Sequence, residues 1–529
     1  MENQLPGSWC LTPIVELLED NSNGKPFQQG WSPQCQNHPA EKNSWGVLKT
    51  TAIQDGKFWD HENKKLPEKI EPRPHLEIVP GDILMTCAGP RNRCGVVCFV
   101  KETRPKLLMS GKMYRFRPNN RLLDSKFLEA YIRSHEAQLA IDAMKTGISD
   151  SGLNLTHSRF ATLKVPFAPF NEQKRIVAKI EQLFSELDNG IAALKTAREQ
   201  LKVYRQAVLK NAFEGRLTAK WREENIDKLE SPEQLLARIQ QERESRYQQQ
   251  LEEWKASIKA WEADGKEGKK PGKPKAFKAM DTIENEEIEI LPRIPNCWKY
   301  ARLAEIAFIG SGMSVSKDRK LNDPVEVPYL RVANVQRGNL ILDEIKTMCI
   351  EKDSLSDLTL EKWDILFNEG GDRDKLGRGW IWENQISHCI TQNHVFRASP
   401  ILKSEYHSKF ISHWGNSFGK DYFEKGGKQT TNLASINKTV LSNFPVPLPS
   451  MEEQHQLIDM LDDMMSQIEA METEFENGIQ RAETLRQSIL KKAFSGQLVP
   501  QDPNDEPASE LLARIQAEMT QRKGITSKR

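Results

Sequence analysis

A polar, glycine-rich loop in the second half of the chain carries residues well suited to contact nucleic acid. Residues 368–379 contain four glycines together with the cations Arg373, Lys375 and Arg378. Free backbone amides and cationic side chains are the groups that bind phosphates and base edges. The loop therefore indicates a DNA contact, while a surface loop in which Asp372 and Arg373 pair with each other is the alternative.

A second loop, residues 88–95, has the same character in the first half of the chain. It presents Arg91, Asn92 and Arg93 between glycines, and it aligns with the first loop when the two halves are superposed by sequence. Equivalent loops that are both cationic strengthen the prediction that each half of the chain contacts DNA.

Another pair of aligned segments, residues 144–149 and 425–432, has polar side chains of the same kind. In the second segment Gln429 and Asn432 could read adenine, and Lys428 could bind a phosphate or guanine. The polar members are Lys145 in the first segment and Lys428, Gln429 and Asn432 in the second.

A third aligned pair lies near the ends of expected strands. Arg331 and Asn334 stand opposite Lys49 and Thr50 in the alignment of the two halves. These four residues could contact DNA in the same way, or they could simply satisfy the backbone at strand ends.

Motifs for catalysis are incomplete. Phe308–Gly312 imitates the F-x-G-x-G loop with which DNA methyltransferases hold S-adenosylmethionine, but we expect an ordinary turn there. The Pro-Pro-containing tetrad that grips a flipped base is missing, because the chain has no Pro-Pro pair. Gly415–Lys420 lacks the spacing and the hydroxyl of an ATP-binding P-loop. We therefore predict that the chain is not an enzyme and binds no cofactor.

Metal chemistry is not indicated either. Cys87, Cys94 and Cys98 are close in sequence, but no Cys-x-x-Cys or His-x-x-x-His accompanies them, so half-buried thiols on a strand are expected. Glu62 and Lys64 lack the upstream acidic partner that a nuclease centre needs.

The composition is that of a soluble protein with several domains. The 529 residues are 28% charged and 38% hydrophobic, and a chain of this length should form about three or four compact units. The eight cysteines are too sparse for a disulfide framework, no membrane helix is expected, and Met1–Pro6 is too polar to open a secretory signal. We expect a cytoplasmic protein. A net charge of +1 means that any attraction to phosphates must come from local patches or from partners.

The chain is internally duplicated. Ala207–Leu217 returns as Ser488–Leu498, and Leu235–Gln240 returns as Leu511–Gln516. The domains that precede these segments are more divergent, and they are recognised as copies by shorter matches such as Gly81–Leu84 with Trp363–Leu366. Alternating strand-like and helical runs, with a helix expected over 126–145, predict that both domains are α+β.

Two long helices connect the domains. Apolar residues spaced three and four apart predict helices over 172–214 and 451–495, which should pair as an antiparallel coiled coil about an approximate two-fold axis. Asn171 and Ser450, the latter with Glu453, are the expected N-terminal caps, and Gly215 and Gly496 suit the position after each helix. At about 1.5 Å per residue each helix is a rod of roughly 60 Å, typical of a spacer, although a bundle packed only for stability is the alternative. The seam residues are Ile176, Ile180, Leu183, Leu187, Ile191, Leu194, Leu201, Tyr204 and Val208, and Leu457, Leu461, Met464, Ile468, Met471, Phe475, Ile479, Ala482, Leu485 and Ile489.

The expected organisation is therefore a domain, a helical region, a second domain and a second helical region. Residues between the halves are rich in Glu, Gln, Lys and Gly, and they predict an unfolded tether. The predicted parts are a first domain at 1–165, a first helical region at 166–246 with a further helix after the long one, a charged linker at 247–290, a second domain at 291–446, and a second helical region at 447–529.

The assembled features resemble one family over essentially the whole chain: the specificity subunits of type I restriction-modification systems. The resemblance is carried by Pro-x-x-x-x-x-Glu-Gln entering each long helix, by Ala-Phe-x-Gly-x-Leu at each exit, and by Thr218–Asn225 with Leu-Leu-Ala-Arg-Ile after it. Tyr329–Gln336 and the loop 371–379 also resemble the recognition domains of that family. The first domain departs from the pattern at Gly46–Ile53, which leaves its base-contacting residues undetermined.

The resemblance implies a division of labour. A chain of this family selects a bipartite, asymmetric site in double-stranded DNA. Two modification subunits bring S-adenosylmethionine and methylate adenines, and two ATP-dependent restriction subunits translocate and cut, with Mg expected in those partners. A protein-binding coiled-coil adaptor without DNA specificity, favoured by the small net charge, is the alternative function.

Overall fold

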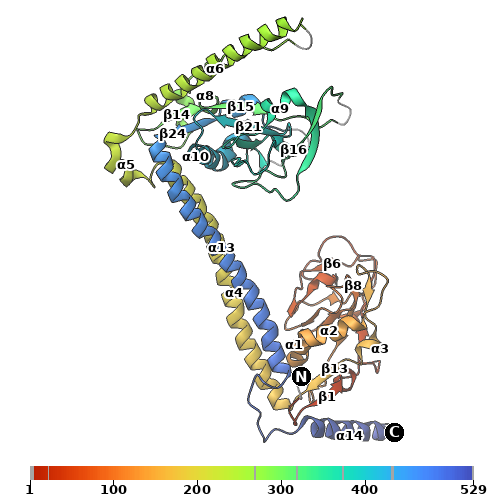
Figure 1. Cartoon of the computed structure of the whole chain (residues 1–529). Helices are drawn as coiled ribbons and strands as arrows, with labels where there is room; N and C mark the ends of the chain where they lie inside the picture. The colour runs from red at the N-terminus through yellow and green to blue at the C-terminus, as the bar shows by residue number, and fades with distance from the viewer. Residues whose placement is uncertain are drawn as a thin grey trace. The chain divides into compact units, whose positions relative to one another are not determined.

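The computed structural model describes residues 5–21, 23–266, 270–316, 320–371, 375–429 and 434–526. Of Lys428, Gln429, Met519 and residues 521–526 only the backbone is described. A mixed α+β domain is followed by a long helix, a second mixed domain and a second long helix, which confirms the predicted fold class and order (Figure 1).

The chain folds as two compact units that do not follow the order of the sequence. One unit comprises residues 1–197 and 474–529, and the other comprises residues 198–473. The boundaries fall inside the long helices. Each unit therefore combines one mixed domain with the start of one long helix and the end of the other.

The first mixed domain is built from short strands in small sheets. Its elements are β1 (Cys10–Pro13), η1 (Ile14–Leu17), β2 (Gln28–Gln29), β3 (Gly46–Leu48), η2 (Thr50–Ala52), β4 (Ile53–Gln54), β5 (Lys57–Phe58), β6 (Asn63–Lys65), η3 (Pro74–Leu76), β7 (Ile83–Thr86), β8 (Ala88–Gly89), β9 (Val97–Phe99), β10 (Leu107–Leu108), β11 (Met113–Phe116), α1 (Ser125–Ile132), α2 (His135–Met144), β12 (Leu153–Asn154), α3 (His157–Phe160) and β13 (Lys164–Phe167). An antiparallel sheet in the order β2-β11-β7-β9 and a mixed sheet β10-β3-β6 form its body. Strand β1, the first of the domain, pairs with β13, the last, so the two ends of the domain lie side by side.

The helix expected over 126–145 is two helices. Ser134 interrupts it: its side chain accepts from the backbone N–H of Ala137 at 3.3 Å and caps α2. A serine that bonds to the backbone two or three residues ahead competes with helix continuation, which is why α1 ends before it.

The second mixed domain has a comparable plan. Its elements are β14 (Lys299–Arg302), α8 (Leu303–Ile306), β15 (Ala307–Ser311), β16 (Pro324–Leu330), β17 (Lys346–Glu351), η5 (Lys352–Ser354), α9 (Leu355–Leu358), β18 (Ile365–Asn368), β19 (Gly370–Gly371), β20 (Ile390–Thr391), β21 (Val395–Pro400), α10 (Glu405–Asn416), α11 (Phe418–Gly426), β22 (Lys428–Gln429), β23 (Ala434–Ser435), α12 (Lys438–Ser442) and β24 (Pro445–Leu448). The sheets are β15-β21-β18, β17-β16-β20 and β19-β23-β22, and β14 pairs with β24 as β1 pairs with β13. The turn expected at Phe308–Gly312 is wrong, because most of that segment is strand β15.

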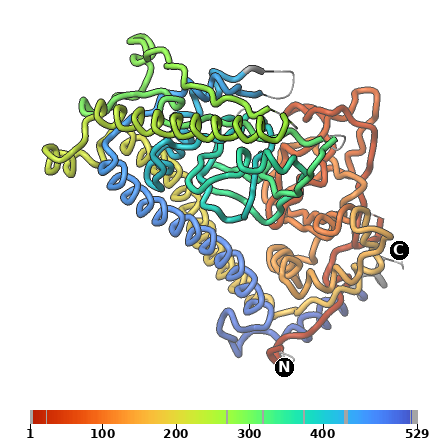
Figure 2. Tube along the Cα trace, turned by 45° about the horizontal axis from the view of Figure 1, so that its top comes forward, coloured from red at the N-terminus to blue at the C-terminus, as the bar shows by residue number. Residues whose placement is uncertain are grey.

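The long helices are α4 (Phe170–Phe213) and α13 (Met451–Phe494), each 44 residues long. They lie side by side in Figures 1 and 2. In the first unit Arg486 pairs with Asp188 at 2.6 Å, and in the second Arg205 pairs with Glu472 at 3.0 Å. Contacts between the start of one helix and the end of the other confirm the antiparallel pairing.

The predicted seam is buried at some positions and exposed at others. Buried seam positions include Leu201 and Ile468 in the middle of the helices, at 7% and 0% exposure. Ile176 and Leu457 are fully buried, whereas Tyr204, Met471 and Leu485 are 51%, 44% and 50% exposed. A straight α-helix has 3.6 residues per turn, so a stripe spaced by 3.5 residues rotates away from its partner along a long helix.

Glycine ends both long helices as predicted. Gly215 and Gly496 have φ of +67° and +70°, and each follows its helix at the position where a left-handed residue satisfies the last carbonyls. At the other end Ser450 caps α13 by accepting from Glu453 N–H at 3.2 Å. The expected cap at Asn171 is wrong, because α4 begins one residue earlier, at Phe170.

The helix after α4 is much longer than predicted. After α5 (Ala219–Asn225) and η4 (Ile226–Lys228), α6 runs from Pro232 to Ala263, so residues 247–263 of the predicted tether are helical. The prediction of a tether overlooked apolar residues at helical spacing: Leu251, Trp254, Ile258 and Trp261. A capping box between Ser231 and Gln234 starts this helix, and its Glu, Gln and Arg residues have high helix propensity.

The rest of the linker is partly held against α6. Trp254 Nε1 donates to Pro271 O at 3.1 Å, and Arg243 lies 3.9 Å from the Phe277 ring. A short helix, α7 (Asn285–Glu289), precedes the second domain, and α14 (Ala508–Thr526) follows the second long helix.

Candidate nucleic-acid interface

Glycines shape the two cationic loops in the same way. Gly89 and Gly95 in the first loop have φ of +146° and +92°, and the aligned Gly371 and Gly377 have φ of +142° and +63°. Such values strain any residue with a Cβ. The shared backbone geometry confirms that the loops 88–95 and 368–379 are structural equivalents.

Arg93 fastens the first loop to a neighbouring segment. Its Nη2 donates to the backbone oxygens of Thr50 and Ile53 at 2.7 Å each. The structure thereby brings Lys49 and Thr50 beside the loop, as a common site requires. Arg93 thus holds the loop through the backbone oxygens of Thr50 and Ile53. Lys49 pairs with Glu62 at 3.3 Å.

Arg91 and Lys145 share a network with two carboxylates. Arg91 donates to Asp142 at 2.5 Å and to Asp150 at 3.0 Å, and its bond to Asp150 raises its pKa. Lys145 donates to Asp142 at 2.9 Å, and this bond lowers the pKa of Asp142. Because the Lys145 side chain is only 6% exposed, the prediction that it contacts DNA directly is not supported by its placement. Asn92 is exposed.

The second domain brings its two candidate segments together through a small sheet. Strand β23 pairs with β19 on one side and with β22 on the other. This places the loop 368–379 next to the segment 425–429. In the first domain β12 pairs with β8, and a bridge joins Thr146 to Asn154, so the same arrangement recurs.

The structure describes the side chains of half of the candidate DNA-contact residues in the second domain. Arg378 and Lys375 are half-buried, and Arg378 Nη2 donates to Val332 O at 3.4 Å. Arg331 Nη2 lies 3.3 Å from Glu344. The contact of Arg378 with Val332 O brings the loop next to the residues that follow β16.

Asn334 has a structural role. Its side chain is 3% exposed. Its Oδ1 accepts from Arg331 N–H at 2.9 Å, and its Nδ2 donates to Ile341 O at 2.9 Å. These contacts do not support a role for Asn334 in reading a base. They fit the alternative, in which Asn334 satisfies the backbone at the end of a strand.

Other candidates stay predictions. Arg373 and Asn432 lie outside the described residues, and Lys428 and Gln429 are described only as backbone in β22. The sequence analysis missed Asp142 and Asp150. Asp142 could have been found from its position three residues before Lys145 on a helix, where the two charges face each other, whereas nothing local signals Asp150.

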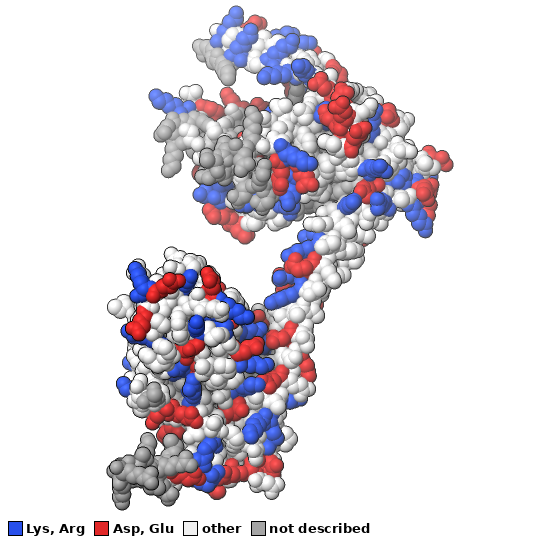
Figure 3. All heavy atoms as spheres, turned by 180° about the vertical axis from the view of Figure 1, so that it is seen from behind, with Lys and Arg blue, Asp and Glu red and all other residues white. Residues whose placement is uncertain are grey.

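The face seen in Figure 3 has no large surface of one sign. Lysine and arginine are interspersed with aspartate and glutamate over the visible described residues. This face therefore offers no broad cationic field to DNA, in keeping with the net charge of +1.

Each domain is anchored to its long helix by the same buried pair. Trp9 Nε1 donates to Glu172 at 3.0 Å, and Trp298 Nε1 donates to Glu453 at 2.8 Å. Both carboxylates are about 1% exposed. This explains the glutamate repeated near the start of the two helices, and it also corrects the expected capping box, because the Glu453 side chain turns to Trp298 instead of its own helix end.

The two anchors differ in their charge. Glu453 also accepts from Thr218 at 2.6 Å and from Arg222 at 2.8 Å. Glu172 accepts from Gln501 as its second side-chain partner, and burial raises its pKa. The second anchor is thus a buried ion pair.

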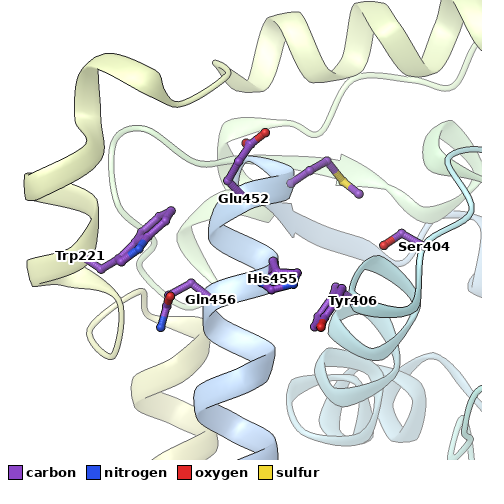
Figure 4. A pocket seen from close by; sticks show the side chains of 7 residues that line it. Trp221, Ser404, Tyr406, Glu452, His455 and Gln456 are labelled. Carbon is purple, nitrogen blue, oxygen red and sulfur yellow. The ribbon is translucent and has the colours of Figure 1, made fainter.

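A cavity of about 420 Å³ lies beside the second anchor, among α5, α10 and the first turns of α13. Figure 4 shows Trp221 on one side, with His455 and Tyr406 close together; their ring centroids are 3.7 Å apart. A cavity of about 430 Å³ occupies the equivalent place in the first unit, where Phe170 and Lys174 stand for Met451 and His455.

Among the described residues no group of three or more His, Cys, Asp or Glu side chains could hold a metal ion. Cys87, Cys94 and Cys98 are buried free thiols, and Cys98 lies on β9.

No helix in the described part of the chain is long and apolar enough to cross a membrane.

The fold defines a class of proteins in which two α+β domains, each with an equivalent loop, alternate with two long antiparallel helices. The sequence pattern described as "Type I restriction modification DNA specificity domain" matches residues 56–196 and 295–481, more than half of the chain. The chain therefore belongs to the family of DNA specificity subunits of type I restriction-modification systems, a family without catalytic activity of its own.

Individual relatives agree with this assignment. The specificity subunit of the type I restriction enzyme EcoKI of Escherichia coli K12 is 23% identical over 532 residues, covering 97% of this chain and 96% of that relative. That of EcoEI of Escherichia coli is 33% identical over 197 residues, covering 37% of this chain and 32% of the relative. A solved chain from work on complex assembly and conformational transition of the type I R-M system has the same fold, with a TM-score of 0.61, 17% identity, and coverage of 94% of this chain and 100% of that one.

Proposed function

We propose that the chain reads a bipartite, asymmetric sequence in double-stranded DNA, with one half-site for each of the recognition domains 1–165 and 291–446. The observation that carries the proposal is a contrast between the halves. The anchors Trp9–Glu172 and Trp298–Glu453 are duplicated, whereas the cationic loops differ in sequence. Equivalent scaffolds with different contact loops are suited to different base sequences.

The residues that would meet DNA belong to the two loops and to the segments beside them. They are Lys49, Arg91 and Asn92 in the first domain and Arg331, Arg373, Lys375, Arg378, Lys428, Gln429 and Asn432 in the second. Arg93, Lys145 and Asn334 would position the loops, because their side chains bond to neighbouring segments. Thr50 would take part through its backbone oxygen, which accepts from Arg93.

The paired helices α4 and α13 would hold the two half-sites at a set distance. Helices of 44 residues are about 66 Å long, or about 19 base pairs of duplex when aligned with it. Pairing along this length resists bending, because bending would separate side chains that are buried between the helices.

The chain would also scaffold partner subunits: two modification methyltransferases, which bind S-adenosylmethionine, and two restriction translocases, which bind ATP and Mg. Equivalent cavities beside Phe170 and Met451 support a partner present in two copies. The family gives the nature of these partners.

Methylome sequencing tests the proposal. Deleting the gene for this chain should abolish one gapped, asymmetric methylation motif, and restoring it should bring the motif back. If every motif persists after deletion, the chain does not direct DNA recognition and the adaptor function is supported instead.

A further inference from the structure

Two carboxylates hold Arg91, the exposed arginine of the loop 88–95, in a closed network. Arg91 Nε and Nη2 donate to Asp150 Oδ1 at 3.1 and 3.0 Å, and Nη1 donates to Asp142 Oδ2 at 2.5 Å. The backbone joins in, because Arg91 N–H donates to Asp150 O at 2.9 Å and Lys145 Nζ donates to Arg91 O at 2.9 Å.

The network offsets the charges of Arg91 and Lys145. These two residues contribute two positive charges, and Asp142 and Asp150 contribute two negative charges. Non-specific binding to DNA depends mainly on how many cations can replace counterions along the phosphates. Arg91 adds little to that attraction while it is held in the network.

A phosphate can nevertheless replace Asp150 as the partner of Arg91. The side chains of Arg91 and Asp150 are 48% and 77% exposed, and ion pairs so accessible to water are weak. A phosphate held against Arg91 can form two charge-assisted bonds in place of those to Asp150. Exchange therefore requires a duplex that is already held close by other contacts.

We propose that Asp150, together with Asp142, is a specificity-determining residue of the first recognition domain. The two carboxylates withhold Arg91 from the phosphates of non-specific DNA and release it when the half-site is seated. The inference rests on the proposed function, because it requires the loop 88–95 to contact DNA.

In sequence, Asp150 has no acidic counterpart in the second domain. Residues 428–433, Lys-Gln-Thr-Thr-Asn-Leu, align with 147–152 at the offset of 281 that relates the two halves, and Thr431 stands at the position of Asp150.

Asp150→Asn in the full chain, bound to its modification subunits, tests the proposal. We compare binding to two duplexes of about 30 base pairs, one with the methylated motif and one with its first half-site scrambled, over a range of salt. Affinity for the scrambled duplex should rise about 5-fold at low salt, with a salt slope steeper by about 0.9, the value for one added phosphate contact. Affinity for the motif should change less than about 2-fold, because Arg91 already contacts phosphate there.

Three controls separate the possible outcomes. Glu68→Gln changes the net charge equally at an exposed position and should leave both affinities unchanged; an effect equal to that of Asp150→Asn would overturn the inference. In the Arg91→Gln background, Asp150→Asn should lose its effect. If Arg91→Gln weakens binding to the motif while Asp150→Asn leaves scrambled binding unchanged, the inference alone fails. If Arg91→Gln does not affect binding to the motif, the loop does not contact DNA and the proposed function of this loop fails as well.

Discussion

Lengthening the paired helices tests whether they set the gap between the half-sites. Leu194 in α4 lies against Gly478 in α13, where an added Cβ would be 3.0 Å from its side chain. Insertions of four residues after Leu194 and after Phe475 therefore fall at nearly the same level of the antiparallel pair. At about 1.5 Å per residue they lengthen it by about 6 Å, and at about 3.4 Å per base pair the gap should grow by one or at most about two base pairs.

The assay is methylome sequencing of cells that express the variant with its modification subunits. Both half-sites should stay the same while the gap increases. Insertions of seven residues keep the heptad register and should add about three base pairs. Four residues inserted after Gly272, in the linker, are the matched control and should leave the gap unchanged. An unchanged gap in the helix variants with methylation intact would refute the spacing role, as would a changed gap in the linker variant.

Three further predictions concern stability. Glu453→Gln should cost about 3 kcal/mol and Glu172→Gln about 1 kcal/mol, because only Glu453 pairs with an arginine, Arg222, at 2.8 Å; equal losses in urea unfolding would contradict this difference. Gly215→Ala should cost about 1–3 kcal/mol, because φ is +67° and the new Cβ would lie 2.4 Å from Pro295, whereas Gly190→Ala, which meets open space in α4, should be neutral or stabilising in thermal unfolding. Burial lowers the pKa of His413 from 6.5 to about 4, so the unfolded chain binds more protons between these values and stability falls as pH drops through them. His413→Gln should remove up to about 3 kcal/mol of this loss between pH 7 and 4, and an unaltered pH dependence of urea unfolding would contradict the assignment.

The long helices could be predicted because their signals are local. The seam residues and the closing glycines lie on the helix itself, so the ends at Gly215 and Gly496 follow from sequence alone. The error at α6 arose although the signal there is local too. Tyr247, Leu251, Trp254, Ile258 and Trp261 lie three and four residues apart, a helical spacing that the polar residues around them obscured. The cap at Ser231 and the helix propensity of Glu, Gln and Arg also favour a helix here.

The candidate site could be predicted as a region but not as a set of contacts. The duplication placed the loops 88–95 and 368–379 at equivalent positions, because alignment transfers backbone geometry. It could not show that Arg93 bonds to Thr50 and Ile53, some 40 residues away in sequence, or that Asn334 is buried. Whether a polar side chain faces DNA or its own loop depends on tertiary packing, which a linear pattern does not contain.

Replacing one recognition domain tests the central claim, that each recognition domain reads its own half-site and that the paired helices set the gap between the half-sites. In the hybrid, residues 5–165 are exchanged for the first recognition domain of another member of the family, and both long helices are kept. Methylome sequencing should show a new first half-site, with the second half-site and the gap unchanged. A change in the second half-site or in the gap, with methylation intact, would contradict the claim.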